Sequence, residues 1–326
     1  MASNGIDFIS NMPDPILLLI LQGLPNTEEV VRTSVLSTRW RYLWTSIPYF
    51  PSLNLDCDRL LKPYFKLHEK FKDFVTWCLA NKAVGLDSFR LCCSDYYSES
   101  TVNVWIKAAV NRNVKSLDLS FYPKKFMNYV LPVGFVAVTR IHLPQCLITC
   151  ESLESLRLFA YQNIISLPSC SGFLGLKVLE LNNVYCYDHD LVAKFLKMCV
   201  VLEELSLIEC VIRARGRICI SSSRLKTLRI HCNSKNVING KKVGFRYGLK
   251  VCCPELVIFE YVGSKCQLIL EDLNSLNKAV IHPKDTLQQT ISPTSGKAAS
   301  KLLAGISHVD SLSLNVYIIH VQTYFL

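Results

Sequence analysis

The sequence lacks the features that would direct a chain into or across a membrane. No lysine or arginine precedes Arg32, whereas a secretory signal needs positive charge ahead of its apolar core. The apolar run ILLLIL at residues 16–21 is too short for a membrane-spanning helix, which needs about 20 apolar residues. Prolines at positions 13, 15 and 25 surround this run. We therefore expect a soluble protein of the cytoplasm, the nucleus or both.

The sequence also lacks the motifs of common enzyme and metal sites. Its 15 cysteines form no Cys-x-x-Cys pair, which argues against zinc ribbons and thioredoxin-like sites and favours free thiols in a reducing compartment. The stretch SPTSGKAAS at residues 292–300 ends like a phosphate-binding loop, but that motif needs glycine in place of Ile291. No G-x-S-x-G or H-E-x-x-H motif occurs. We expect no enzyme activity, no cofactor and no metal ion.

Apolar residues are what the sequence has in quantity. Half of its 326 residues are apolar and only 19% are charged, which favours a folded chain over a disordered one. This length leaves room for a small N-terminal module and one larger domain or solenoid.

The run at residues 16–21 predicts a short helix. Asp14 is expected to cap its first turn, Pro15 suits the first helical position, and Gly23 is expected to end it. A helix that is hydrophobic on every side must be covered on every side. One side can pack on the core of the chain, and the other side needs a further cover.

Two more short helices are expected at residues 26–36 and 37–48, with Asn26 and Ser37 as their caps. Three such short helices rarely bury enough surface to be stable alone. The leucine run and two tryptophans therefore indicate a docking surface, or alternatively a helical cap on a larger core. The apolar positions of the third helix follow the spacing i, i+3, i+4 and i+7: Trp40, Leu43, Trp44 and Ile47.

Residues 12–48, MPDPILLLILQGLPNTEEVVRTSVLSTRWRYLWTSIP, resemble the F-box in the form found in plant F-box proteins with leucine-rich repeats. Met12 stands where that family usually has leucine. The resemblance implies that these helices bind the small Skp-type adaptor, which links such proteins to a cullin-based ubiquitin ligase and would cover the second side of the leucine run. It assigns adaptor binding to these residues: Met12, Pro13, Ile16, Leu17, Ile20, Leu21, Leu24, Pro25, Val35, Ser37, Arg39, Trp40, Leu43 and Trp44.

The rest of the chain repeats a pattern of apolar residues spaced L-x-x-L-x-L. The middle apolar residues are separated by 23, 26, 23 and 31 residues, close to the about 20–29 residues of a leucine-rich repeat. Alternate residues of a strand point to opposite sides, so the apolar positions are expected to face inward and Arg157 outward. The middle residues are Leu156, Leu179, Leu205, Leu228 and Phe259.

Three of these repeats begin with a cysteine, at Cys150, Cys199 and Cys253. We expect this recurrent cysteine to be a small buried hydrophobic residue that fills a tight corner, in preference to a metal ligand. Residues 190–199 are expected to form a helix that returns the chain between two strands.

These patterns predict an α/β protein with a short three-helix F-box followed by an irregular leucine-rich-repeat solenoid. The solenoid is expected to have a curved, mostly parallel sheet, with helices or irregular arms on its convex side. We place the F-box at residues 4–50, a helical linker at 51–85 and degenerate repeats at 86–326. The plant family commonly continues into a C-terminal FBD module. Residues 315–326 do not match it, so we expect a truncated C-terminus whose last repeat lacks a terminal cap.

The formal net charge of +10 comes from one stretch of the sequence. Residues 211–250 contain eleven lysines and arginines and no acidic residue, and the rest of the chain is nearly neutral. We hypothesise an electropositive rim that receives an acidic or phosphorylated target. The alternative is a solvated loop that keeps an apolar protein soluble. The rim would consist of Arg213, Arg215, Arg217, Arg229, Lys241, Lys242 and Arg246.

Taken with the resemblance, these features predict the substrate-recognition adaptor of a Skp–cullin–F-box ubiquitin ligase. The F-box would dock on the Skp-type adaptor, and the repeats would bind the target protein that is to be ubiquitinated. The alternatives are a leucine-rich-repeat scaffold or small-ligand sensor without ligase activity, or a truncated, non-functional variant. A membrane is not expected as a partner, because the apolar runs are too short to span one. Nucleic acid is not expected either, because the basic stretch has few aromatic residues beside it.

Overall fold

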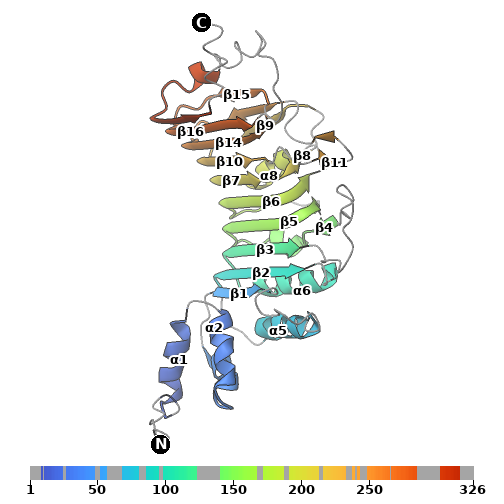
Figure 1. Ribbon diagram of the computed structural model, residues 1–326, viewed down its shortest axis with the longest axis vertical. Coiled ribbons are helices and arrows are strands. Elements are labelled where there is room, and N and C mark those ends of the chain that lie inside the picture. The colour runs from blue at the N-terminus through green and yellow to red at the C-terminus, as the bar shows by residue number, and fades with distance from the viewer. Residues whose placement is uncertain are drawn as a thin grey trace, which may run out of the picture. The chain divides into compact units, whose positions relative to one another are not determined.

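The computed structural model describes residues 9, 11–24, 27–47, 52–56, 68–80, 86–94, 98–122, 140–166, 172–186, 191–212, 216–232, 237–238, 241–242, 248–264, 266–284 and 302–315 (Figure 1). The chain divides into two compact units, Met1–Leu119 and Ser120–Leu326. Within the described ranges, no helix is long and apolar enough to cross a membrane.

The first unit begins with three short helical segments, as the sequence predicts. The second and third segments each end in a turn of 3-10 helix. In chain order they are α1 (Asp14–Gln22), α2 (Thr27–Arg32) with η1 (Thr33–Val35), and α3 (Trp40–Leu43) with η2 (Trp44–Ser46).

The expected caps of these helices have different outcomes. The position just before α3 is held by Arg39, whose side chain makes no capping bond, but Ser37 Oγ accepts a hydrogen bond from the backbone N–H of Trp40 at 3.4 Å. The cap expected at Asp14 is wrong: Pro13 holds the capping position without a side-chain hydrogen bond, and Asp14 lies in the first turn. The carboxylate of Asp14 binds Arg39 instead. Asn26 lies outside the described residues.

Two longer helices also belong to the first unit, α5 (His68–Ala80) and α6 (Glu99–Val110). The side chain of Ser98 caps α6 by accepting a hydrogen bond from the backbone N–H of Thr101. The indole of Trp105 in α6 donates to Thr76 Oγ1 in α5 at 3.1 Å.

The first unit also contains three strands of a sheet, in the order β1 (Ser52–Asp56), β2 (Ser88–Ser94) and β3 (Ser116–Tyr122). The division between the two units falls within β3. Strands β1 and β2 are parallel, with Leu55 opposite Leu91. The sheet therefore begins before residue 86, and the segment 51–85 contributes a strand as well as a helix.

The second unit confirms the predicted fold class and the repeat register. Its long sheet is parallel and runs in the order β5 (Ser155–Ser166), β6 (Val178–Cys186), β7 (Glu204–Ile208), β10 (Thr227–His231), β14 (Ile258–Ser264), β16 (Lys278–Lys284) and β17 (Ser311–Leu314) (Figure 1). The residues opposite one another at the middle position are Leu156, Leu179, Leu205, Leu228, Phe259, Ala279 and Leu312.

Short elements fill the connections of the second unit. They are α7 (Gln145–Ile148), the expected returning helix α8 (Leu191–Met198), β4 (Arg140–His142) beside β5, β8 (Val211–Ile212) beside β6, and an antiparallel pair β11 (Val237–Ile238) and β12 (Lys241–Lys242).

A second parallel sheet is formed by the connections themselves. Its strands are β9 (Ile218–Ser221), β13 (Leu249–Cys252) and β15 (Leu268–Glu271), with β13 in the middle. Ile220, Leu249 and Val251 are fully buried, whereas Cys219 and Ser221 are exposed, so one face of this sheet covers apolar core. The sequence pattern predicts helices or irregular segments between the strands of the long sheet. In these three connections, part of the segment is instead a β-strand.

The recurrent cysteine is buried, as expected. Cys150, Cys199 and Cys253 are all inaccessible to solvent or nearly so. Each stands three residues before a leucine that is also buried, at the point where the chain turns into the next strand. The cysteine therefore serves as a small apolar side chain at the bend of the repeat.

Candidate docking surfaces

The leucine run folds into a helix of which only one line is covered. Leu17 and Leu21, one turn apart in α1, are completely buried. Ile16, Leu19 and Ile20 are 45%, 63% and 44% exposed, and they follow the spacing i, i+3 and i+4 along the helix. We call these three residues the docking stripe. The helix thus has a buried line and an uncovered aliphatic stripe.

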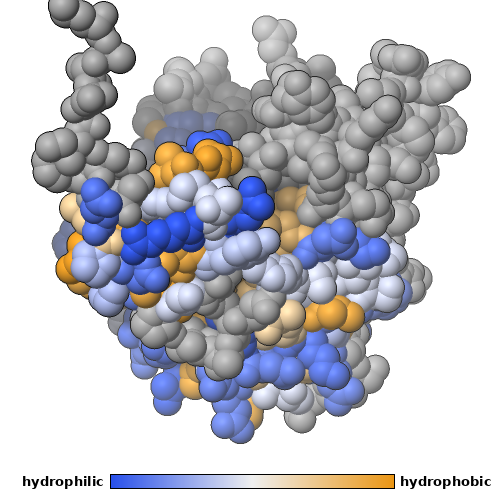
Figure 2. All heavy atoms as spheres, turned by 90° about the horizontal axis from the view of Figure 1, so that it is seen from below, coloured by the Kyte–Doolittle hydropathy of each residue, from blue (hydrophilic) through white to orange (hydrophobic). Residues whose placement is uncertain are grey.

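Further apolar side chains are exposed in the same unit, at the end of the second helical segment and in the third. Val35 is 86% exposed, Leu36 is 62% exposed and Tyr42 is 63% exposed. Figure 2, which views the molecule from below, shows hydrophobic surface exposed among hydrophilic side chains. Several large apolar side chains that remain exposed on one small unit favour a protein–protein contact.

The structure separates the expected adaptor-binding residues into two groups. The accessible group consists of Met12, Pro13, Ile16, Leu24, Ile20, Val35, Ser37 and Arg39, each exposed or partly exposed. The buried group consists of Leu17, Leu21, Trp40, Leu43 and Trp44. Pro25 lies outside the described residues.

The burial of both tryptophans corrects the expectation that they form the docking surface. Trp44 is in edge-to-face contact with Trp77 of α5, with ring centroids 4.6 Å apart, and lies 6.5 Å from Phe74. Trp44 is therefore covered by α5, a helix of the same unit, and the two buried tryptophans lie beneath the exposed surface of the F-box helices. The exposed residues Leu19, Leu36 and Tyr42 are absent from the adaptor-binding set that the resemblance implies. Helical spacing could have indicated Leu19, because it lies three residues after Ile16 and so on the same side of the helix.

Arg39 does not extend freely from this surface. Its Nε donates to Asp14 Oδ1 at 2.9 Å, and its Nη2 donates to Asp14 Oδ1 and to the carbonyl oxygen of Met12. The guanidinium thus joins the loop before α3 to the first turn of α1.

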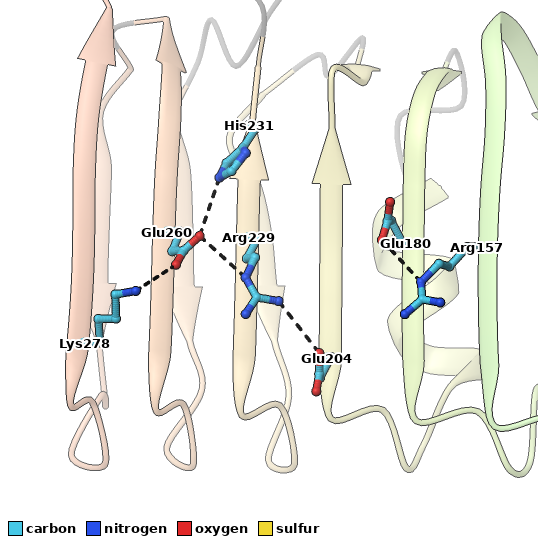
Figure 3. Close-up of polar contacts among 7 residues, drawn as sticks. All are labelled: Arg157, Glu180, Glu204, Arg229, His231, Glu260 and Lys278. Atoms are coloured by element: carbon cyan, nitrogen blue, oxygen red, sulfur yellow. Dashed lines mark hydrogen bonds and ion pairs between the residues drawn. The ribbon is translucent and has the colours of Figure 1, made fainter. Parts of the chain in front are cut away.

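The long sheet of the second unit presents a face of ion pairs (Figure 3). Arg157 of β5 pairs with Glu180 of β6 at 3.6 Å, and Arg229 of β10 lies between Glu204 of β7 at 3.8 Å and Glu260 of β14 at 3.5 Å. Glu260 also receives two other side chains, which are Lys278 at 3.4 Å and His231 at 3.6 Å.

A second row of ion pairs lies just before the strands. Glu154 pairs with Lys177 at 3.1 Å, and Glu203 pairs with Lys226 at 2.9 Å. In the repeats of β5 and β6, the two rows have opposite signs. Glu154 is followed three residues later by Arg157, and Lys177 is followed three residues later by Glu180. In both rows, the charge of the β5 repeat is therefore paired with an opposite charge of the β6 repeat.

The basic residues of the expected rim are largely beyond what the structure describes. Arg213, Arg215 and Arg246 lie outside the described residues, and of Lys241 and Lys242 only the backbone of β12 is placed. The described rim residues are Arg217, which donates to Gln267 Oε1 at 2.9 Å, and Arg229, which is shared between two carboxylates. The electropositive rim therefore stays a prediction.

No group of three or more metal-ligating side chains occurs in the part of the chain that the structure describes. The sulfhydryl of Cys252 donates to Asp272 Oδ2 at 3.2 Å, so a single thiol and a single carboxylate meet there.

Comparison with known proteins gives two matching family models. The F-box domain model matches residues 9–51. A model described as the leucine-rich repeats of FBD-associated F-box protein At5g56370 matches residues 102–242. The first range contains α1 with its docking stripe and the two helical segments that follow. The second range contains strands from β3 to β10 of the sheet.

Curated relatives from Arabidopsis thaliana match most of the chain. F-box/FBD/LRR-repeat protein At5g56420 is 30% identical over 321 residues, which cover 94% of this chain and 65% of the relative. F-box/FBD/LRR-repeat protein At3g52680 is 32% identical, over 78% of this chain and 53% of the relative. The chain thus spans about half to two thirds of the length of these relatives. With its helical unit and its repeat register, the chain belongs to the plant F-box proteins with leucine-rich repeats.

Proposed function

We propose that this chain is the substrate-recognition adaptor of a Skp–cullin–F-box ubiquitin ligase. The F-box helices bind a Skp-type adaptor, and the leucine-rich repeats hold a target protein. The chain itself performs no chemistry. It raises the effective concentration of the target near the enzyme that transfers ubiquitin.

The observation that carries this proposal is the docking stripe of α1. Ile16, Leu19 and Ile20 remain open although Trp40 and Trp44 of the same helical module are buried. Covering an aliphatic side chain of this size completely contributes about 1.5–3 kcal/mol. The stripe therefore supports a partner with an apolar groove, and the F-box match supports a Skp-type adaptor as that partner.

A charge introduced into the docking stripe tests adaptor binding. Leu19→Asp is expected to weaken the affinity of the full chain for a purified Skp-type adaptor by at least about tenfold, because a buried carboxylate would have no partner in an apolar interface. Isothermal titration calorimetry measures the affinity, and circular dichroism checks that the chain remains folded.

Val104→Asp is the matched control for this experiment. Val104 is 60% exposed on α6 in the same unit, so the variant adds the same charge at a similar exposure outside the F-box helices. Equal adaptor affinity of the Leu19→Asp variant and the wild type would reject the contact at α1.

We further propose that the basic stretch at residues 211–250 selects an acidic or phosphorylated segment of the target. The support is its uniform positive charge. Arg229 contributes least to this selection because two carboxylates already share its guanidinium.

Charge reversal tests the basic stretch. The variant with Lys241, Lys242 and Arg246 changed to Glu is expected to lose most proteins that the wild-type chain captures from plant cells treated with a proteasome inhibitor, since acidic segments would be repelled. The control reverses Lys72, Lys107 and Lys197 outside the stretch. An unchanged set of captured proteins would remove the rim hypothesis.

A further inference from the structure

We infer that Arg39 is a positioning residue for the docking stripe, because it clamps the first turn of α1 and need not touch the adaptor. The inference rests on the proposed function and adds a role within the same site. The family resemblance places Arg39 among the adaptor-binding residues, whereas its contacts in the structure lead back into the chain.

The clamp joins segments 25 residues apart in the sequence. Arg39 Nε donates to Asp14 Oδ1 at 2.9 Å, and Nη2 reaches both Asp14 Oδ1 and the Met12 carbonyl oxygen. One guanidinium therefore binds a side chain and a backbone group on the two sides of Pro13. A planar guanidinium suits such a two-sided contact, because its N–H groups point in fixed directions.

The clamp matters at the start of α1 because this helix has little stability of its own. The helix has only nine residues, which is too short to be stable by itself in water, and Pro13 provides no side-chain cap. Its two fully buried residues, Leu17 and Leu21, lie on a single line along the helix. Contacts along one line leave the helix free to roll about that line, and a third contact at its first turn prevents this.

The roll of α1 decides where the docking stripe points. Ile16 and Ile20 are one turn apart on the same side of α1, beside the line of Leu17 and Leu21, so a small rotation about the buried line would turn both isoleucines together toward or away from their own unit. Arg39 therefore affects adaptor binding through the orientation of Ile16, Leu19 and Ile20.

A double-mutant cycle separates this role from direct contact. Asp14→Asn, Arg39→Gln and the double variant are measured in the full chain for affinity to a purified Skp-type adaptor. Each single variant is expected to weaken binding about fivefold, the range of an exposed charge-assisted pair. The double variant should be no weaker than Arg39→Gln alone, because both single changes open the same clamp.

Hydrogen exchange of the free chain gives a second readout that needs no adaptor. The backbone N–H groups of Ile16 and Leu17 donate to the carbonyl oxygen of Pro13 in the first turn. They should exchange faster in Arg39→Gln than in the wild type. The backbone N–H of Val102, which donates to Ser98 in α6, serves as the internal reference and should not change.

A matched ion pair provides the control. Lys115 Nζ and Asp87 Oδ1 are 2.9 Å apart in the same unit, just before two strands, and both side chains are exposed, like those of Asp14 and Arg39. The variant Asp87→Asn with Lys115→Gln should bind the adaptor as the wild type does.

Three results would overturn the inference. Additive losses in the cycle would mean that Arg39 contacts the adaptor independently of Asp14. Unchanged exchange at Ile16 and Leu17 would mean that the clamp does not hold the helix, and wild-type affinity of Arg39→Gln would mean that the clamp does not affect docking. If the wild-type chain fails to bind any Skp-type adaptor, the proposed function fails, and hydrogen exchange alone then decides whether Arg39 fixes α1.

Discussion

Burial makes the cysteines of the repeats poor nucleophiles. It raises the pKa of the Cys199 thiol and of the Cys210 thiol to about 12 each, and that of the Cys253 thiol to about 11. Cys210 also donates to the carbonyl oxygen of Leu181 at 3.2 Å. These thiols remain protonated near neutral pH and behave as small apolar groups, whereas Cys219 is exposed.

The raised pKa of Cys253 predicts a loss of stability in alkali. The ordinary value of this thiol is 9.0, so an unfolded chain releases its proton above pH 9 while the folded chain holds it up to about pH 11. Unfolding then releases protons, and the free energy of unfolding falls as the pH rises from 9 to 11, by up to about 1.4 kcal/mol per pH unit for this one group. Urea unfolding at pH 8, 9, 10 and 11 measures the fall.

The variant Cys253→Ala identifies the group responsible. It is expected to be less stable at every pH because it leaves a small cavity, but its stability should fall less steeply between pH 9 and 11 than that of the wild type. The same slope in both proteins would show that Cys253 does not titrate in this range.

At the scale of elements, the turn before β6 packs directly on the end of α8. Phe173 in the turn stacks on Phe195 of the helix, with ring centroids 6.3 Å apart. Gly172 allows this approach, because a Cβ atom there would lie 2.1 Å from the carbonyl oxygen of Met198 and 2.9 Å from its Cα. The close packing thus depends on the absence of a side chain at one position.

Gly172→Ala is therefore expected to destabilise the second unit. The methyl group collides with backbone, which cannot move aside as a flexible side chain would, so the turn must shift away from α8 at a cost of about 1–3 kcal/mol. Thermal unfolding followed by circular dichroism measures the effect. Gly216→Ala is the control, since a Cβ at that position has no described atom within 4 Å apart from the adjoining residues of the chain. Equal stability of the two variants would contradict the packing argument.

The stack of repeats as a whole decides how much one side chain contributes. At the middle position of the long sheet, the residues from β5 to β16 are at most 1% exposed, whereas Leu312 in β17 is 44% exposed. An interior repeat is covered by a neighbour on each side, and β17 has β16 on one side. The same residue type in the same register thus lies in two different environments.

Leucine-to-alanine variants at these two positions should differ strongly. Leu228→Ala is expected to lower the free energy of unfolding by about 3–4 kcal/mol because it leaves a cavity between two neighbouring repeats. Leu312→Ala should cost less than about 1 kcal/mol because its side chain is half solvated in the folded state. Urea unfolding of both variants checks the difference. A similar loss at Leu312 would show that a further segment covers β17.

The sequence by itself determined the features that rest on local periodicity. Helical spacing found the three F-box segments and the apolar line from Trp40 to Ile47, although not that this line is buried. The L-x-x-L-x-L pattern placed Leu156, Leu179, Leu205, Leu228 and Phe259 opposite one another. Both patterns repeat within a few residues or at a regular interval, and they reflect which side of an element is apolar.

Only the tertiary structure decided which apolar surface stays open and which charges meet. Trp44 is buried because α5, more than 20 residues further along the chain, supplies Trp77 as its cover. Arg39 turns back to Asp14, and Arg229 lies between carboxylates of two other strands. The sequence gives the polarity of each face, but covering a face depends on the distant segments that the fold brings against it.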